Sequence, residues 1–87
     1  MAEICRFYGI IIRMYGNDHF PPHFHVIYNE YHATIEIETG EILQGSLPSK
    51  QLKYVQVWTD IHKKELEENF EQLRAETQTF KKVKPLE

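Results

Sequence analysis

The sequence has little of what a secreted or membrane protein needs. Its single cysteine, Cys5, cannot form an internal disulfide or, alone, a cysteine-type zinc site. The longest aliphatic run, Ile10-Ile11-Ile12, falls far short of the roughly 20 apolar residues that span a membrane. Glu3 and Arg6 interrupt the N-terminal segment, so it lacks the apolar stretch of a signal peptide. We therefore expect a soluble, cytoplasmic protein with no membrane partner.

The chain is also short, and it has little positive charge. Its 87 residues allow one small domain, and a hydrophobic fraction of 41% is enough to give that domain a core. Lys and Arg number 10 against 13 Asp and Glu, and this net charge of −3 disfavours nucleic acid as a partner. The excess of acidic over basic residues lies in residues 1–40, which also hold four of the five histidines: His19, His23, His25 and His32. Any chemistry is best sought there.

The pattern of apolar residues predicts an α+β fold with an antiparallel meander of about four strands. Runs rich in Ile, Val, Phe and Tyr are bounded by turn residues, as strands are. A Gly inside such a run is typical of a bulge. The expected strands are Ile4–Tyr15 with a bulge at Gly9, His23–Tyr28, Tyr31–Glu38 and Glu41–Gly45.

A hairpin joined at Asn29-Glu30 would fix the register of the second and third strands. With a two-residue loop, Phe24 and Val26 lie opposite Ile35 and Ala33 on the core face. The other face then carries His23 opposite Glu36, His25 opposite Thr34, and His32. In this register the apolar residues of both strands lie on the same face, so one face of the sheet is apolar and the other is rich in histidine.

Apolar residues at spacings of three and four from Leu52 to Leu73 predict a helical layer over the apolar face. Ser46 or Ser49 is the expected cap, and Val57 and Ile61 are expected to widen the buried stripe. The pattern leaves open whether one long or two short C-terminal helices form, because a break near residues 60–62 would divide them. We expect a single domain over residues 1–76 and a loose tail over residues 77–87.

The histidines and nearby carboxylates form the candidate site. Alternation places His23 and His25 on one side of a strand, about 6.5–7 Å apart. His19 and Asp18 approach from the stiff loop Gly16–Pro22, and Glu36 lies across from His23. The candidate catalytic residues are His19, His23 and His25, with Asp18 and Glu36 to orient them.

Three interpretations of this cluster stay open. His19, His23 and His25 have the ligand types of a divalent metal such as zinc, although the spacing is not specific for one. Two imidazoles poised by a carboxylate also suit metal-free acid–base catalysis, as in ribonucleolytic proton transfer. Alternatively, the histidines are ordinary residues of a solvated sheet face, or that face docks a protein partner.

Four segments carry a family resemblance: Arg6–Ile10, Met14-Tyr15, Asn17–Val26 and Gly45–Pro48. They resemble a family of small bacterial proteins catalogued as domain of unknown function 4160, over nearly the whole chain to about Glu76. Pro21-Pro22-His23-Phe24-His25 is the most specific part. The chain departs from the family at Asn29, where glycine is expected, and this touches only the turn geometry.

The resemblance implies a role without assigning a catalytic residue. Members are often labelled transcriptional regulators, and they tend to be encoded beside another small domain in a toxin–antitoxin-like arrangement. Our leading hypothesis is therefore a small cytoplasmic bacterial protein that acts through a small protein partner or as a homo-oligomer, with the histidine-rich sheet face as its working surface. The alternatives are a small His-dependent ribonuclease or metal-binding hydrolase using His19, His23 and His25, and a DNA-binding regulator. The net charge and the lack of a helix-turn-helix pattern disfavour the last of these.

Overall fold

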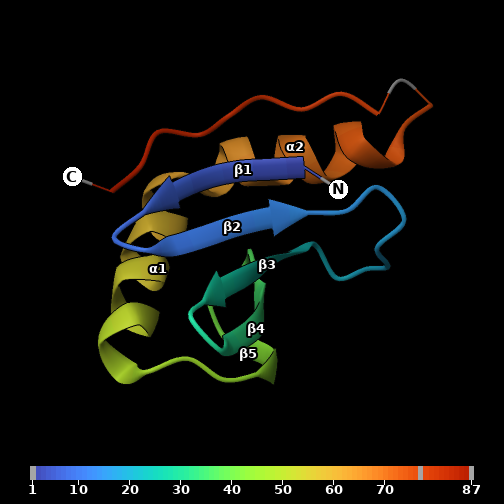
Figure 1. Ribbon diagram of the computed structural model, residues 1–87. Coiled ribbons are helices and arrows are strands. Elements are labelled where there is room, and N and C mark those ends of the chain that lie inside the picture. Colours follow the sequence, from blue (N-terminus) through green and yellow to red (C-terminus); the bar gives the residue numbers. More distant parts are fainter. Residues whose placement is uncertain (1, 77, 87) are drawn as a thin grey trace.

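A five-stranded antiparallel sheet is followed by two helices in the computed structural model, which describes residues 2–76 and 78–86. The strands follow one another in space in the order β1-β2-β3-β4-β5, and α1 and α2 lie against one side of the sheet (Figure 1). The predicted α+β meander is confirmed, with five strands in place of about four. Within the described residues, neither helix is long and apolar enough to cross a membrane.

The additional strand arises because the first predicted element is a hairpin. β1 (Ala2–Phe7) and β2 (Ile10–Met14) pair antiparallel, and Tyr8-Gly9 forms the turn between them. Both turn residues have left-handed backbones, with φ values of 51° and 77°. Such a turn matches the twist of two paired strands. The bulge predicted at Gly9 is wrong, because this glycine reverses the chain instead of kinking one strand.

The central hairpin has the predicted register. β3 (His23–Tyr28) and β4 (Tyr31–Glu36) pair from His23↔Glu36 to Tyr28↔Tyr31. Asn29 takes the left-handed turn position with a φ of 52°, which asparagine tolerates better than most residues. Phe24 and its neighbours on the same face are buried, so the core face is the predicted one.

β5 (Ile42–Gly45) forms the open edge of the sheet beside β4. Its last residue, Gly45, has a φ of 83°, and a Cβ atom there would lie 2.0 Å from the carbonyl oxygen of His32. Only glycine allows this close approach of the two backbones.

The helical layer consists of two helices, α1 (Ser49–Ile61) and α2 (Lys63–Arg74), which meet at His62. Neither predicted serine caps α1: Pro48 occupies that position, and no side chain accepts a capping hydrogen bond. The predicted burial of Val57 and Ile61 is also wrong, since their side chains are 53% and 62% exposed. α1 turns Val55, Trp58 and Thr59 toward the sheet instead.

Trp58 is the centre of the core. It is fully buried, and its ring centroid lies 5.6 Å from that of Phe7 and 5.8 Å from that of Phe24. These contacts join α1 to β1 and β3, and rings at such distances stabilise a core beyond the area they bury. The helices therefore cover the Phe24 face of the sheet and leave the opposite face to the histidines.

Residues 78–86 are packed against the domain, which differs from the loose tail expected from their composition. They run as an extended segment beside β1 and α2 (Figure 1). Val83 is buried, and its N–H donates to the carbonyl of Ile4 on the edge of β1. The Trp58 indole N–H donates to the carbonyl of Lys84 at 2.8 Å.

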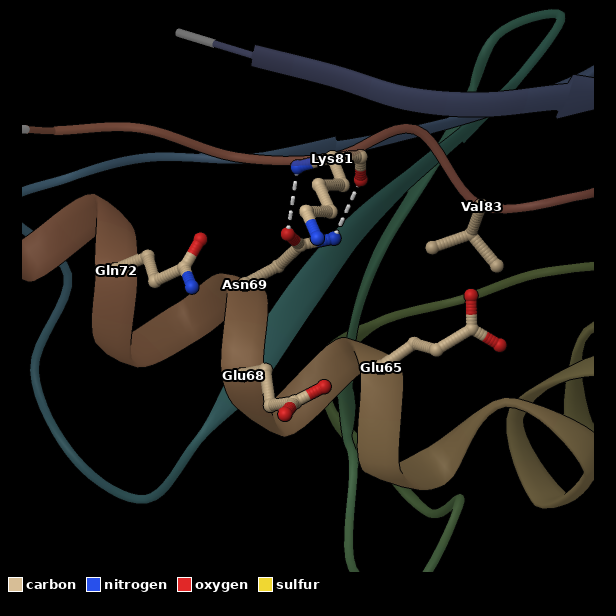
Figure 2. Close-up of a pocket in the computed structure, with 6 residues that line it drawn as sticks. All are labelled: Glu65, Glu68, Asn69, Gln72, Lys81 and Val83. Carbon is tan, nitrogen blue, oxygen red and sulfur yellow. Dashed lines mark hydrogen bonds between the residues drawn. The ribbon is translucent and has the colours of Figure 1, made fainter.

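Asn69 on α2 binds the backbone of the same segment. Its amide donates to the carbonyl of Lys81 at 2.7 Å, and the N–H of Lys81 donates back to its Oδ1 atom at 2.8 Å (Figure 2). Buried amides normally have such partners, because an unpaired polar group in the interior is costly. The segment is thus held by backbone contacts along its length.

We predict that Asn69→Ala destabilises the protein by about 1–3 kcal/mol, because it leaves the N–H and carbonyl of Lys81 without their partner. In a domain of this size, each kcal/mol lowers the melting temperature by about 4–8 °C. Thermal unfolding followed by circular dichroism measures the effect. Gln72→Ala, at an exposed position one turn further along α2, is the control and should stay within about 0.5 kcal/mol. Equal melting temperatures for the two variants would contradict the role of Asn69.

We also predict that the thiol of Cys5 is unreactive in the folded protein. Cys5 is buried in the core, and this burial raises the pKa of its thiol, so less of the reactive thiolate forms. Modification by Ellman's reagent should be at least about tenfold slower in the native protein than in denaturant. A small-molecule thiol in both solutions controls for the reagent, and equal native and denatured rates would contradict the burial of Cys5.

Candidate functional site

The loop between β2 and β3 carries Asp18 to the open face of the sheet. Its course depends on Gly16, where a Cβ atom would lie 2.7 Å from the carbonyl oxygen of Leu73 on α2. A larger residue would push the loop away from the helix. The N–H of Asp18 donates to the carbonyl of Tyr15 at 3.4 Å, which closes the turn before the loop enters β3.

His23 and His25 reach the same place from β3. Strand alternation sends Phe24 into the core and both histidines to the other side. Their side chains are only 12% and 16% exposed, and that of Asp18 is 20% exposed. The three groups are therefore largely shielded from solvent while still reachable from it.

The nitrogen atoms of both histidines converge on one carboxylate oxygen. Asp18 Oδ2 lies 3.1 Å from His23 Nε2 and 2.9 Å from His25 Nε2. These three atoms all lie within 4.8 Å of one another, and each can act as a metal ligand. The arrangement offers two imidazole nitrogens and one carboxylate oxygen around a single point.

Hydrogen bonding assigns the tautomer of His23. Its Nδ1 atom lies 2.7 Å from the carbonyl oxygen of Pro21, which can only accept, so Nδ1 carries a proton. In a neutral imidazole, Nε2 then has a lone pair, and this lone pair faces the carboxylate of Asp18. Two acceptors at 3.1 Å repel unless a proton or a cation lies with them.

Rings on three sides hold His25 in place. Tyr15 packs against it at 4.6 Å between ring centroids, His23 at 5.3 Å, and His32 stacks on it at 5.7 Å. Among the described residues, its Nδ1 atom is buried without a hydrogen-bond partner. The orientation of His25 therefore depends on ring packing and on its contact with Asp18.

Phe70 on α2 packs against His23, and Phe20 in the loop packs against Phe70. Phe70 lies 5.6 Å from His23 and 5.7 Å from Phe20, measured between ring centroids. Phe20 is exposed, and the Arg74 guanidinium lies 4.1 Å above its ring. The spacing of apolar residues on α2 predicts only that Phe70 is a core residue. Its contact with His23 depends on the orientation of the helix relative to β3, which the spacing does not give.

The predicted site residues separate into two groups. Asp18, His23 and His25 come together as one cluster, whereas His19 is exposed in the loop and is no part of it. Glu36 is the cross-strand partner of His23, but its carboxylate accepts a hydrogen bond from the hydroxyl of Thr39 at 3.2 Å. Asp18 is thus the carboxylate that contacts both histidines.

A cavity of about 250 Å³ lies beside the cluster on the same face of the sheet. It is lined by His25 and His32, by Thr34 on β4, and by Gln44 at the edge strand. A second and smaller hollow, of about 90 Å³, lies under the C-terminal segment beside Asn69 (Figure 2). Only the first adjoins the candidate ligands.

Comparison with curated proteins and with solved structures gives no match. A family model does match, over residues 9–71, and it is described as a domain of unknown function, DUF4160. The matched region contains Asp18, His23 and His25 together with β2 to β5, α1 and most of α2. It confirms the resemblance that the sequence segments carry. The chain belongs to the DUF4160 family.

Proposed function

We propose that this protein binds a divalent metal ion through Asp18, His23 and His25 and uses it for hydrolytic chemistry. The convergence of both Nε2 atoms on Asp18 Oδ2, at 3.1 and 2.9 Å, carries the proposal. A bound cation would resolve the repulsion between the lone pair of His23 and the carboxylate. The carbonyl of Pro21 would serve as the outer partner that metal-bound histidines usually have.

The three atoms lie within 4.8 Å of one another, and two of their distances are close to those around a small cation. Ligands about 2.0–2.1 Å from a tetrahedral metal lie about 3.3 Å apart. The two observed nitrogen–oxygen distances, 3.1 and 2.9 Å, need widening by only a few tenths of an ångström. Imidazole and carboxylate donors suit zinc and its first-row neighbours, and the single thiol, Cys5, is buried in the core away from the cluster.

Three protein ligands leave a coordination position for water, which distinguishes catalytic zinc sites from closed structural ones. The cluster is also exposed enough for water to enter, as the 12–20% exposure of its side chains indicates. A divalent ion bound there would supply a Lewis acid and a water that loses its proton near neutral pH. The residues favour hydrolysis as the reaction class.

We predict that the metal-stripped protein binds one Zn²⁺ per chain. At a free zinc concentration of 100 times Kd, binding should stabilise the fold by about 2.7 kcal/mol. His25→Ala and Asp18→Ala each remove a ligand and should weaken the affinity about a hundredfold or more, since even outer partners are worth 10–100-fold. Calorimetric titration and metal analysis after gel filtration measure both effects.

His19→Ala and Glu36→Gln are the matched controls, because each removes a candidate side chain that lies outside the cluster. Both should bind Zn²⁺ as the wild type does. Circular dichroism checks that every variant is folded. The metal proposal fails if the wild type binds no divalent ion, or if His25→Ala binds it equally well. RNA cleavage that needs His25 but no metal would instead assign acid–base chemistry to the same residues.

A protein partner is the second candidate function, and it rests on the exposed side of α1. Val57 and Ile61 lie one turn apart there, and both are more than half exposed. Neighbouring exposed apolar residues on one helix face favour a protein contact. They support a contact with a small partner protein or a second copy of the chain, but on α1 and not on the histidine face where the sequence leads us to expect it. Such a partner would be the other protein of the toxin–antitoxin-like pair that the family resemblance implies.

We expect the product of the neighbouring gene to co-purify with the wild-type protein and to be lost from a Val57→Glu/Ile61→Glu variant. The charges would have to be buried at the contact without a partner, which is costly. Co-expression and pull-down, followed by gel filtration, measure the complex. Leu43→Glu, at an exposed apolar position of β5, is the control and should keep it. A monomeric wild-type protein without a partner would contradict this candidate.

A further inference from the structure

We propose that the site acts on phosphate esters, with Arg13 binding the phosphoryl group beside the metal ligands. The inference rests on the proposed metal site and names its substrate class. One row of side chains crosses all five strands of the sheet. In this row Glu3, Arg13, His25, Thr34 and Gln44 are consecutive cross-strand partners.

Directly paired residues of adjacent antiparallel strands point to the same face, with Cβ atoms about 4.5–5.5 Å apart. Arg13 is therefore the immediate neighbour of His25 on the histidine face. A long guanidinium side chain at this position can reach a ligand bound between it and the cluster. No other residue of the row between Glu3 and Gln44 carries a fixed positive charge.

The charge of Arg13 is available to a ligand. Within residues 2–76 and 78–86, Arg13 forms no ion pair. Its other neighbour, Glu3, is engaged by Arg6, whose guanidinium donates to both carboxylate oxygens at 2.8 and 3.2 Å. This pairing lowers the pKa of Glu3 and keeps it ionised, but its charge is balanced by Arg6. Arg13 is therefore a half-buried cation without an ion-pair partner, next to the cluster that we propose binds the metal ion.

Two adjacent positive centres favour an anion with several oxygens. Guanidinium groups bind phosphate with paired, charge-assisted hydrogen bonds, and a metal ion stabilises the charge that develops on a phosphoryl group. The cavity of about 250 Å³ continues the same row beyond His25. Its lining of Thr34, Gln44 and His32 offers hydroxyl, amide and imidazole groups to a polar substituent of the ester.

The reaction this arrangement suits is hydrolysis of a phosphoester bond. The oxygen of water forms the new bond to phosphorus, the bond from phosphorus to the ester oxygen breaks, and the departing alcohol takes one proton from the water. Nothing is oxidised or reduced, and water is the only co-reactant. Arg13 would bind the non-bridging oxygens in this step without exchanging a proton itself.

Two measurements on the zinc-loaded protein test the inference: binding of inorganic phosphate by calorimetry, and release of nitrophenolate from bis(p-nitrophenyl) phosphate. Arg13→Gln should weaken phosphate binding about tenfold or more and slow the hydrolysis, while Zn²⁺ affinity stays at the wild-type value. Arg13→Lys should recover part of the lost phosphate affinity, because it keeps the positive charge but lacks the paired N–H donors of the guanidinium. Gln44→Ala should affect the diester more than inorganic phosphate.

Lys53→Gln is the matched control, since it removes one positive charge from α1, on the other side of the sheet, and should change neither measurement. A short RNA oligonucleotide and a small phosphate ester, compared as substrates, distinguish a polymer from a free metabolite as the source of the ester. Equal phosphate binding by wild type and Arg13→Gln, with Zn²⁺ still bound, overturns this inference alone. Absence of Zn²⁺ binding overturns the proposed function and this inference with it.

Discussion

The alternation of side chains along β3 is the constraint on which the fold and the site both depend. Phe24 and Val26 enter the core, where Phe24 packs against Trp58, and His23 and His25 are forced to the opposite face. A slip of one residue would bury the histidines and expose the apolar residues, so the core energetically enforces the register. The position of the histidines is thereby a by-product of core packing, and it requires no stabilising interaction of its own.

The carboxylate of the cluster depends on a different part of the molecule. Asp18 stands on a loop whose path is set by close contact between Gly16 and the backbone of Leu73 at the end of α2. Phe70 of the same helix packs against His23. The end of α2 therefore positions both the loop and one of the histidines. α2 is in turn held to the C-terminal segment by Asn69, so packing distant from the cluster sustains its geometry.

Much of this could be read from the sequence where short-range periodicity decides the structure. The register of β3 and β4 follows from matching parity on both strands, and with it the shared face of His23 and His25. The prediction of a bulge at Gly9 fails because the left-handed backbone of Tyr8 is not apparent in an apolar run. The periodic pattern identifies the apolar residues of α1 but does not fix the rotation of the helix about its own axis. The predicted burial of Val57 and Ile61 is wrong for this reason.

Contacts between elements far apart in the chain cannot be predicted from the pattern of apolar and polar residues. Register makes Glu36 the neighbour of His23, but it does not say where a flexible carboxylate points, and Glu36 turns to Thr39. The loop residue Asp18 takes the place beside the histidines. The C-terminal segment likewise looks loose by composition, because its attachment uses its own backbone groups, which every sequence possesses.

A net charge of −3 is compatible with the anion site that we propose. Net charge sums groups whose fields cancel locally, and at short range only the uncancelled ones matter. On the histidine face, Glu3 is balanced by Arg6, whereas Asp18 contacts two imidazoles and Glu36 lies opposite His23. Arg13 is the cross-strand neighbour of His25 and is half-buried, where water screens its charge less than that of a surface group. A divalent cation bound at the cluster, together with Arg13, would make this part of the face positive, so the acidic composition of the chain and the proposed anion site are compatible.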